Sequence, residues 1–485
     1  MKSNPGIFVL TLPRQLVLLT LGVFLTISNC IGIAQAANSG KLNVLFIVSD
    51  DMNNDLGCYG NSVVHSPHID RLASTGMRFD RAYCQVPLCN PSRVSFLSGL
   101  RPDKTQVYTL LEGTRSHLGD WVMLPEHFRH QGYYTAMVGK IYHTGEGHED
   151  PRSWDFEQRE FGKRPPRDQI LKWGNPDGPI GHTIDWSWLK TADRDTPDGI
   201  VARKAAEVME QAVQAGKPFF LAAGFRRPHA PYAAPKKYFD LYPVPSMRLP
   251  AAVPVGYYAN LLAATINYPA PDRPLSELEQ RELIAAYYAC NSYIDAQVGV
   301  LLSALDRLKL WDNTVVVYLG DHGYHLGDHG GFWHKLSLFE EATRVPMIIY
   351  APGMKAGGHA CGQLVELVDL YPTLASLCGL KLPAGLDGAD LSPVLDNPSQ
   401  AVKDAAYSLV ARSLDPAKSA KDRAYLGRSV RTLRWRYTEW EQGKRGIELY
   451  DHRHDPRELV NLAGKPRYAK QETRLKKLLQ AGQGE

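Results

Sequence analysis

Cysteine is scarce in this sequence of 485 residues, which contains only seven. No two of them have the Cys-x-x-Cys spacing of a zinc site. Their small, odd number does not indicate a disulfide framework. A single bridge, such as one between Cys361 and Cys378, stays open at this point. The cysteines are Cys30, Cys58, Cys84, Cys89, Cys290, Cys361 and Cys378.

A strong excess of one charge is also lacking. The sequence has 55 Lys and Arg against 51 Asp and Glu, a formal net charge of +4. This balance gives no general case for nucleic-acid binding, although it is compatible with a locally basic pocket for an anionic substrate. The hydrophobic and charged contents, 44% and 22%, are those of an ordinary soluble protein. The length allows two or three domains, or one large domain with a smaller companion.

Long apolar runs are absent after the first 40 residues, so no later stretch could span a bilayer. The early run, Leu16–Ile27, is preceded by only two charges, Lys2 and Arg14. It is followed by Ala34-Gln35-Ala36, a small-x-small cleavage site. This pattern predicts a secretory signal peptide over residues 1–36, and export to the periplasm or the extracellular space after cleavage near Ala36.

Two other interpretations of this segment stay open. The uncharged stretch Gln15–Gly40 is long enough to remain as a membrane anchor. Lipid attachment at Cys30 is less favoured, because Asn29 is a poor residue before a lipidated cysteine. Export without stable membrane insertion is the preferred interpretation.

After this segment, apolar runs of strand length alternate with amphipathic helical segments, a pattern typical of an α/β domain. After about residue 400 the pattern changes to alternating basic and apolar residues, typical of antiparallel strands. The expected strands are Asn43–Val48, Thr135–Val138, Pro218–Gly224, Thr314–Leu319, Val345–Tyr350, a pair within Arg428–Trp440, and Ile447–Tyr450. The expected helices are one that begins at Pro67, with Ser66 as N-cap and Gly76 after its last turn, then Ile200–Ala215, Ser276–Leu308 with a break near Gly299 left open, and Lys470–Leu479.

Ionisable residues follow four of the expected strands. They are Asp50-Asp51, Lys140 with His143, Arg226-Arg227-Pro228-His229, and Asp321-His322. Because ligands in open α/β sheets bind outside the carboxyl ends of the strands, we expect these groups to share one edge. Carboxylates with one imidazole could hold a divalent cation there, and such oxygen-rich sites favour Ca²⁺ or Mg²⁺. Any one of these residues alone would more often be a turn residue or a helix cap.

The segment Cys89-Asn90-Pro91-Ser92-Arg93 precedes a short expected helix that ends before Gly99. Pro91 suits a first helical position. Cys89 would then lie at a helix N-terminus, where the dipole lowers the pKa of a thiol and favours a nucleophile. For a cysteine taken at random, a buried structural role would be the commoner explanation.

The Cys-x-Pro-Ser-Arg spelling, followed by Ser-Gly-Leu-Arg-Pro at 98–102, resembles the signature of the sulfatase family. Gly139-Lys140-x-x-His143, Arg227-Pro228-His229-Ala230-Pro231, His322 after Asp321, and Trp333-His334-Lys335 resemble its iduronate-2-sulfatase branch. Glu448-Leu449-Tyr450-Asp451 and Asp455-Pro456-x-Glu458 are also similar to sulfatases. The resemblance runs from about residue 41 to about residue 463.

This resemblance implies the fold and the cofactors. The fold would be a large mixed, mostly parallel sheet sandwiched by helices over residues 37–400, with a small antiparallel α+β subdomain over 401–485. A maturation enzyme would oxidise Cys89 to formylglycine, whose hydrate is the nucleophile. One Ca²⁺ would bind Asp50, Asp51, residue 89, Asp321 and His322.

The resemblance also implies a secreted hydrolase of sulfate esters in oligo- or polysaccharides, with uronate 2-O-sulfate as the first substrate to test. The hydrated residue 89 would lose a proton to Asp321 or to solvent and attack sulfur. A general acid would protonate the leaving alcohol, with His229 preferred over Lys335, and His143 would then act as base to expel sulfate. The expected catalytic residues are Cys89, Arg93, Lys140, His143, His229 and Lys335, and the expected substrate-binding residues are Lys140, His229, Tyr324 and Lys335.

Two alternatives stay open. Phosphomonoesterases and phosphonate hydrolases share this sheet and metal edge, but typically use Ser or Thr as nucleophile. A non-catalytic glycan-binding protein would have lost metal ligands, and none is missing here. The long loops Tyr142–Pro197 and Tyr242–Pro274 are expected to shape the pocket. Trp154, Trp186, Trp188 and Tyr324 are candidate stacking residues, and His325, His329 and His334 are expected to have supporting or surface positions.

Overall fold

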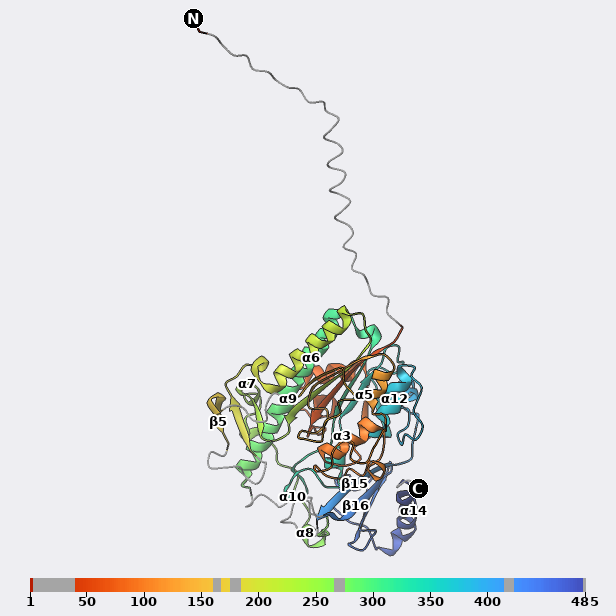
Figure 1. Cartoon of the computed structure of the whole chain (residues 1–485). Coiled ribbons are helices and arrows are strands. Elements are labelled where there is room, and N and C mark those ends of the chain that lie inside the picture. Colours follow the sequence, from red (N-terminus) through yellow and green to blue (C-terminus); the bar gives the residue numbers. More distant parts are fainter. Residues whose placement is uncertain (3–39, 160–166, 175–184, 266–274, 414–422, 483–485) are drawn as a thin grey trace. The chain divides into compact units, whose positions relative to one another are not determined.

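The computed structural model describes residues 1–2, 40–159, 167–174, 185–265, 275–413 and 423–482 (Figure 1). The expected signal peptide and its cleavage site near Ala36 lie outside these ranges, except for the first two residues. Parts of the two long loops also lie outside them. None of the helices in the described ranges has the length and apolar character needed to cross a membrane.

A nine-stranded mixed sheet forms the centre of the fold, and this confirms the expected α/β class. Five neighbouring strands run parallel, in the order β9-β1-β7-β3-β4. Beyond β9 the sheet continues with β13, which is antiparallel to β9, and then with β2, which is antiparallel to β13. The bounds are β1 Asn43–Asp50, β2 Met77–Tyr83, β3 Tyr134–Gly139, β4 Phe156–Gln158, β7 Phe219–Pro228, β9 Thr314–Gly320, β12 Arg344–Val345, β13 Met347–Tyr350 and β14 Ala360–Glu366.

Two hydrophobic cores lie on the two faces of this sheet, because successive side chains of a strand point to opposite faces. Along β1, Leu45 and Ile47 belong to one core, and Val44, Phe46 and Val48 to the other. The first core is covered by α2 (Pro67–Thr75), α6 (Pro197–Gln214) and α9 (Glu277–Leu308), and the second by α3 (Cys89–Ser98), α5 (Leu124–His130) and α12 (Leu370–Leu377) (Figure 1). The continuous apolar sequence of β1 is thus explained by burial on both sides.

The long helix α9 is continuous, so the expectation of a break near Gly299 was wrong. A Cβ atom at Gly299 would lie 2.7 Å from the ring of His68 in α2. This glycine therefore allows two helices to approach closely and does not interrupt one. Ser66 precedes α2 as expected, but its hydroxyl accepts a hydrogen bond from the Gly57 amide and does not cap the helix.

The long loop after Tyr142 contributes two strands of a second, three-stranded sheet. They are β5 (Ile170–Trp173) and β6 (Trp186–Leu189), joined by β8 (Tyr232–Pro235). Trp154 and Trp186 are buried in the two cores, and Trp188 packs partly buried against the first core. Trp154 and Trp186 are therefore packing residues and not the stacking platforms that the sequence suggested.

The C-terminal strands form a separate four-stranded antiparallel sheet, as expected, which begins six residues after the boundary expected near residue 400. The Leu409 amide donates a 2.8 Å hydrogen bond to Gln85 O, so this sheet contacts the chain just before Cys89. Arg436 forms buried ion pairs with Glu340 of the main domain and with Glu458. The elements are β15 (Ala406–Ser413), β16 (Arg423–Arg431), β17 (Trp435–Trp440), β18 (Ile447–Asp451) and α14 (Ala469–Ala481).

The six cysteines of the described residues are all free thiols, which answers the question left open for Cys361 and Cys378.

Candidate active site

The four expected strand ends lie side by side, because β9, β1, β7 and β3 are consecutive parallel strands of the sheet. Their carboxyl ends carry Asp321, Asp50, His229 and Lys140 in that order. Asp51 follows directly after β1 with a left-handed backbone, φ 64°. Its amide donates to Asp321 Oδ1 at 3.1 Å, so the first strand end is tied to the end of β9. The parallel register therefore brings residues 270 positions apart into contact.

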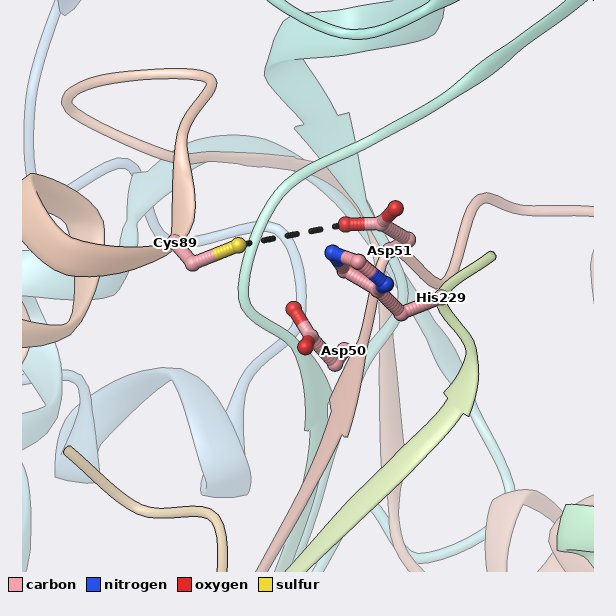
Figure 2. A group of neighbouring side chains, drawn as sticks. All are labelled: Asp50, Asp51, Cys89 and His229. Carbon is pink, nitrogen blue, oxygen red and sulfur yellow. Dashed lines mark hydrogen bonds between the residues drawn. The ribbon is translucent and has the colours of Figure 1, made fainter. Parts of the chain in front are cut away.

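Cys89 is the first residue of α3 and points at this edge (Figure 2). Its Sγ lies 3.3 Å from Lys335 Nζ, 3.4 Å from His322 Nε2 and 4.0 Å from Asp51 Oδ1. Burial raises the pKa of the thiol, and Asp50 adds to this rise, but Lys140 and Lys335 contribute to an overall pKa below the ordinary value. A group at position 89 is thus held among carboxylates, an imidazole and two ammonium groups.

Arg93, one turn further along α3, fixes the strand ends in place. Its Nε donates to Asp321 Oδ2 at 2.8 Å, and its Nη2 lies 3.6 Å from Asp50 Oδ1. Its Nη1 donates to the backbone carbonyls of Lys140 and Ile141. The side chains of Arg93, Asp50 and Asp321 are fully buried. Arg93 therefore links the carboxyl ends of β1, β9 and β3.

Two lysines neutralise the carboxylates. Lys140 Nζ donates to Asp50, and Lys335 Nζ donates to Asp51. Burial raises the pKa of Asp50, but the positive charges around it, Lys140 first and then Arg93 and Lys335 among others, together outweigh burial and hold this pKa well below its ordinary value. Burial likewise opposes the charged form of Lys335, but Asp51, Cys89 and Asp50 together reverse the effect and leave the pKa of Lys335 well above its ordinary value. Both lysines therefore supply fixed positive charge.

The chemistry of the donor atoms fits a divalent cation. Single ligand atoms of Asp50, Cys89, Asp321 and His322 lie within 4.8 Å of one another, and Asp51 and His229 join Asp50 and Cys89 in a second such group. Asp50 Oδ1 is buried and has no hydrogen-bond partner among the described residues. His322 Nδ1 donates to Gly323 O at 2.9 Å, so Nε2 is the ring atom that faces the cluster, 3.2 Å from Asp51 Oδ1 and 3.4 Å from Cys89 Sγ. Three carboxylates and one imidazole are a ligand set that suits Ca²⁺ or Mg²⁺.

His229 enters the site from the end of β7, and Figure 2 shows its ring beside the two carboxylates. Its Nδ1 donates to Ala230 O at 2.7 Å, and its amide donates to Asp50 O at 3.1 Å. Burial lowers the pKa of His229 well below its ordinary value, and Lys335 adds to this effect. The imidazole is therefore neutral in the free protein.

His143 lies beyond Lys140, with a buried Nδ1 that has no hydrogen-bond partner in the described ranges. Burial lowers its pKa to about 3, and the charge of Lys140 adds to this effect. Its ring is 5.0 Å from that of His148 in a T-shaped contact. The imidazole of His143 is therefore neutral near neutral pH, which is the form that a general base must have before it accepts a proton.

The low pKa of His143 predicts a pH-dependent contribution to stability. An unfolded histidine has a pKa of about 6.5, so the unfolded chain binds more protons as the pH falls from about 6.5 toward 3, and the free energy of unfolding decreases. His143→Gln should therefore lose less stability than the wild type between about pH 7 and 5, by on the order of 1 kcal/mol. Urea unfolding at the two pH values measures this. His359 is exposed, so His359→Gln is the control and should keep the pH dependence of the wild-type free energy of unfolding. An equal change in the free energy of unfolding with pH for the wild type and His143→Gln would contradict the low pKa of His143.

Four other residues singled out from the sequence, Tyr324 and three histidines, form hydrogen bonds with neighbouring protein groups. Tyr324 is fully buried, and its hydroxyl lies 2.9 Å from His334 Nδ1 and accepts a 2.7 Å hydrogen bond from Tyr232. Tyr324 thus supports the segment that carries Lys335 and does not offer its ring to a substrate. His325 Nε2 bonds the Ser337 hydroxyl, and His329 bonds Glu341. These positions agree with the supporting roles expected for the three histidines.

Several supporting residues were not found from the sequence. The Tyr287 hydroxyl donates to Asp51 O at 2.6 Å and holds the left-handed turn after β1, although nothing in the pattern of α9 singles it out. Asn90 Nδ2 donates to the carbonyls of Thr109 and Glu112 and fastens a loop to the cysteine motif. The motif position of Asn90 was the one available signal for its role.

Comparison with known proteins decides the family. The sulfatase family model matches residues 42–380, which is most of the chain. The chain belongs to the sulfatase family. A second model, of the N-sulphoglucosamine sulphohydrolase C-terminal region, matches residues 327–485 and includes the four-stranded sheet. This sulfatase is 34% identical to iduronate 2-sulfatase of Mus musculus, over 85% of its own chain and 88% of the mouse protein. The human iduronate 2-sulfatase is also 34% identical, over 87% and 90% of the two chains.

Solved structures confirm the fold. One neighbour, solved in complex with its substrate D-glucosamine-2-N,6-O-disulfate, has a TM-score of 0.71 at 22% identity and covers 91% of this chain and 97% of its own. The phosphonate monoester hydrolase of Agrobacterium radiobacter has a TM-score of 0.73 at 22% identity and covers 91% and 95%. The sulfatase is therefore a sulfuric ester hydrolase of the iduronate-2-sulfatase-like branch, in a fold that it shares with phosphonate hydrolases.

Proposed function

We propose that this sulfatase hydrolyses sulfate esters of carbohydrates, with a uronate 2-O-sulfate as the first substrate to test. One observation supports this assignment most strongly. Cys89 of the sulfatase motif lies within 4.8 Å of carboxylates from two strand ends and of His322, with two lysines beside them. A thiol held in this way is positioned for chemistry at an anionic ester. The iduronate 2-sulfatases among its relatives suggest the uronate substrate.

Residue 89 would act as formylglycine, whose hydrate supplies an oxygen nucleophile for attack on sulfur. Asp50, Asp51, Asp321 and His322, together with residue 89, would hold one Ca²⁺, which supplies Lewis-acid charge for the sulfate oxygens. Lys140, Lys335 and Arg93 add fixed positive charge around the same point. Because these cations are in place before the substrate binds, they stabilise charge on the sulfate oxygens in the transition state.

The leaving alcohol needs a proton, because an alkoxide is a poor leaving group. We assign this role to His229, whose imidazole would gain a proton when the negative charge of a bound sulfate raises its pKa. Lys335 is less suited to it, because its pKa lies well above its ordinary value and it therefore holds its proton. His143, neutral and close to Lys140, would take the proton whose loss releases sulfate and restores the aldehyde.

The proposed Ca²⁺ gives the next prediction. Dialysis against a chelator should lower kcat by about 10²-fold or more, because the carboxylate cluster then lacks its cation. Added Ca²⁺ should restore the rate. Chelator already saturated with Ca²⁺ is the control and should have no effect. Full activity after exhaustive chelation, with metal analysis confirming removal, would contradict a metal at this cluster.

A screen of defined substrates tests the reaction itself. The enzyme is incubated with oligosaccharides that carry uronate 2-O-, hexosamine 6-O- or fucose sulfate, and with phosphate and phosphonate monoesters. Release of sulfate from at least one sugar ester, fastest from the uronate 2-O-ester, is the expected result. Turnover of only the phosphorus esters would replace the proposal with a phosphonate hydrolase, and binding without turnover would favour a glycan-binding protein.

Export belongs to the same proposal. The apolar segment and the small-x-small site at Ala34–Ala36 would direct the chain to the periplasm or the cell exterior, where sulfated polysaccharides are found. A maturation enzyme would act on Cys89 in the producing cell. N-terminal sequencing of the exported protein should begin at Ala37.

A further inference from the structure

The last helix, α14, carries a stripe of exposed cations. Lys470, Arg474 and Lys477 follow one another at spacings of four and three residues, so they share one face of the helix. They span about 10 Å along its axis at 1.5 Å per residue. Lys465 and Arg467, both exposed, come four and two residues before the helix begins at Ala469 and add two further cations to this part of the chain. We call these five residues the α14 basic stripe.

The opposite face of α14 anchors the helix. Leu475 and Leu479 are buried in a small core with Val430, Tyr437 and Leu449, which belong to three strands of the C-terminal sheet. The cations therefore stand on a rigid helix, and they do not belong to a loose charged tail. Because this apolar face is already covered, α14 has no surface left for insertion into a lipid layer.

The stripe has no acidic partners within the described ranges. None of its five cations forms an ion pair with a described carboxylate, although many other surface cations do, such as Arg71 with Asp306 and Lys236 with Asp240. The neighbouring Lys476 pairs with Glu439, which marks the edge of the stripe. Residues 465–477 contain six cations and one carboxylate. The net charge of this short segment is therefore larger than the net charge of +4 of the whole chain.

We propose that the α14 basic stripe binds a sulfated polysaccharide chain at a site separate from the catalytic edge. This inference rests on the proposed function, because it takes the polymeric form of the same substrate class as the ligand. Regularly spaced cations on a rigid surface suit a polyanion with regularly spaced sulfate groups. Such contacts release counterions, so the affinity falls steeply with salt. Retention of the polymer at this surface would raise the local concentration of esters for the active site.

The test is a titration of the full-length enzyme with heparin between about 50 and 200 mM NaCl. Lys470→Gln, Arg474→Gln and Lys477→Gln are combined in one variant, since glutamine keeps a similar helix propensity. The matched control combines Lys217→Gln, Lys381→Gln and Lys444→Gln, which remove the same charge from three scattered exposed positions. We expect the stripe variant to bind heparin about 10-fold more weakly at low salt, with a slope of log K against log salt that is smaller by about 2 to 3. The control should match the wild type.

Several outcomes would overturn the proposal. These are equal losses in the stripe and control variants, an unchanged stripe variant, and a stripe variant that loses binding to phosphatidylserine vesicles but not to heparin. Hydrolysis of a small sulfated sugar should be unchanged in the stripe variant, whereas KM for the polymer should rise. Heparin binding needs no turnover, so its loss is distinguishable from failure of the proposed reaction. If no sugar sulfate is hydrolysed but the stripe still selects heparin, only the catalytic assignment fails.

Discussion

Replacement of Cys89 by alanine is expected to lower kcat/KM for a sulfated sugar by about 10⁴-fold or more, because it removes the nucleophile and leaves only binding and charge stabilisation. The measurement is sulfate release at several substrate concentrations. The Cys89 side chain is buried at the first position of α3, and its polar contacts are to the site residues Lys335, His322 and Asp51, each of which has other hydrogen-bond partners, so folding should be preserved.

A second cysteine variant controls this experiment. Cys84 is also buried, five residues earlier, and its Sγ lies 3.7 Å from Ala342 O; among the described residues it belongs to neither group of candidate metal ligands around Cys89. Cys84→Ala should keep most of the activity. A Cys89→Ala protein with the wild-type melting temperature and more than about a tenth of the wild-type activity would rule out catalysis through residue 89.

Replacement of Arg93 by methionine is expected to lower the free energy of unfolding by about 3–5 kcal/mol, because it leaves the buried carboxylates of Asp50 and Asp321 without their arginine partner. Chemical denaturation monitored by fluorescence measures the change. The free energy of unfolding of Arg93→Lys should lie between those of the wild type and Arg93→Met. A lysine keeps the positive charge, but it lacks the planar, forked donor groups of the guanidinium.

The control for this prediction is an ion pair at the surface. Arg71 and Asp306 are 46% and 42% exposed, so solvent screens their attraction. Arg71→Met should therefore change stability by less than about 1 kcal/mol. Similar losses for the two substitutions would mean that burial of the Arg93 pairs has no special effect.

The edge of the sheet could be predicted from the sequence because three facts combine there. Buried parallel strands have continuous apolar sequences, their carboxyl ends meet at one edge, and the residues just after β1, β9, β7 and β3 are ionisable. The sequence also predicted that Cys89 lies at the N-terminus of a helix, and Cys89 is the first residue of α3. The strand order itself was not predicted, because apolar runs do not state which strand is the neighbour of which.

The surroundings of the site could not be predicted in the same way. Tyr287 supports Asp51 from the middle of α9, 236 residues away, and only the packing of α9 on the sheet reveals it. Gly299 suggested a helix break, although its role is the close approach of His68. Trp186 and Tyr324 suggested sugar stacking, but both are buried, because large aromatic rings are more often core residues.

The most direct measurement of the central claim is the mass of the peptide that contains residue 89, taken from enzyme purified in its active form. Conversion of Cys89 to formylglycine removes one sulfur and two hydrogens and adds one oxygen. We predict the lighter peptide, in a fraction that rises with the specific activity of each preparation. An unmodified thiol at position 89 in fully active enzyme would contradict the account.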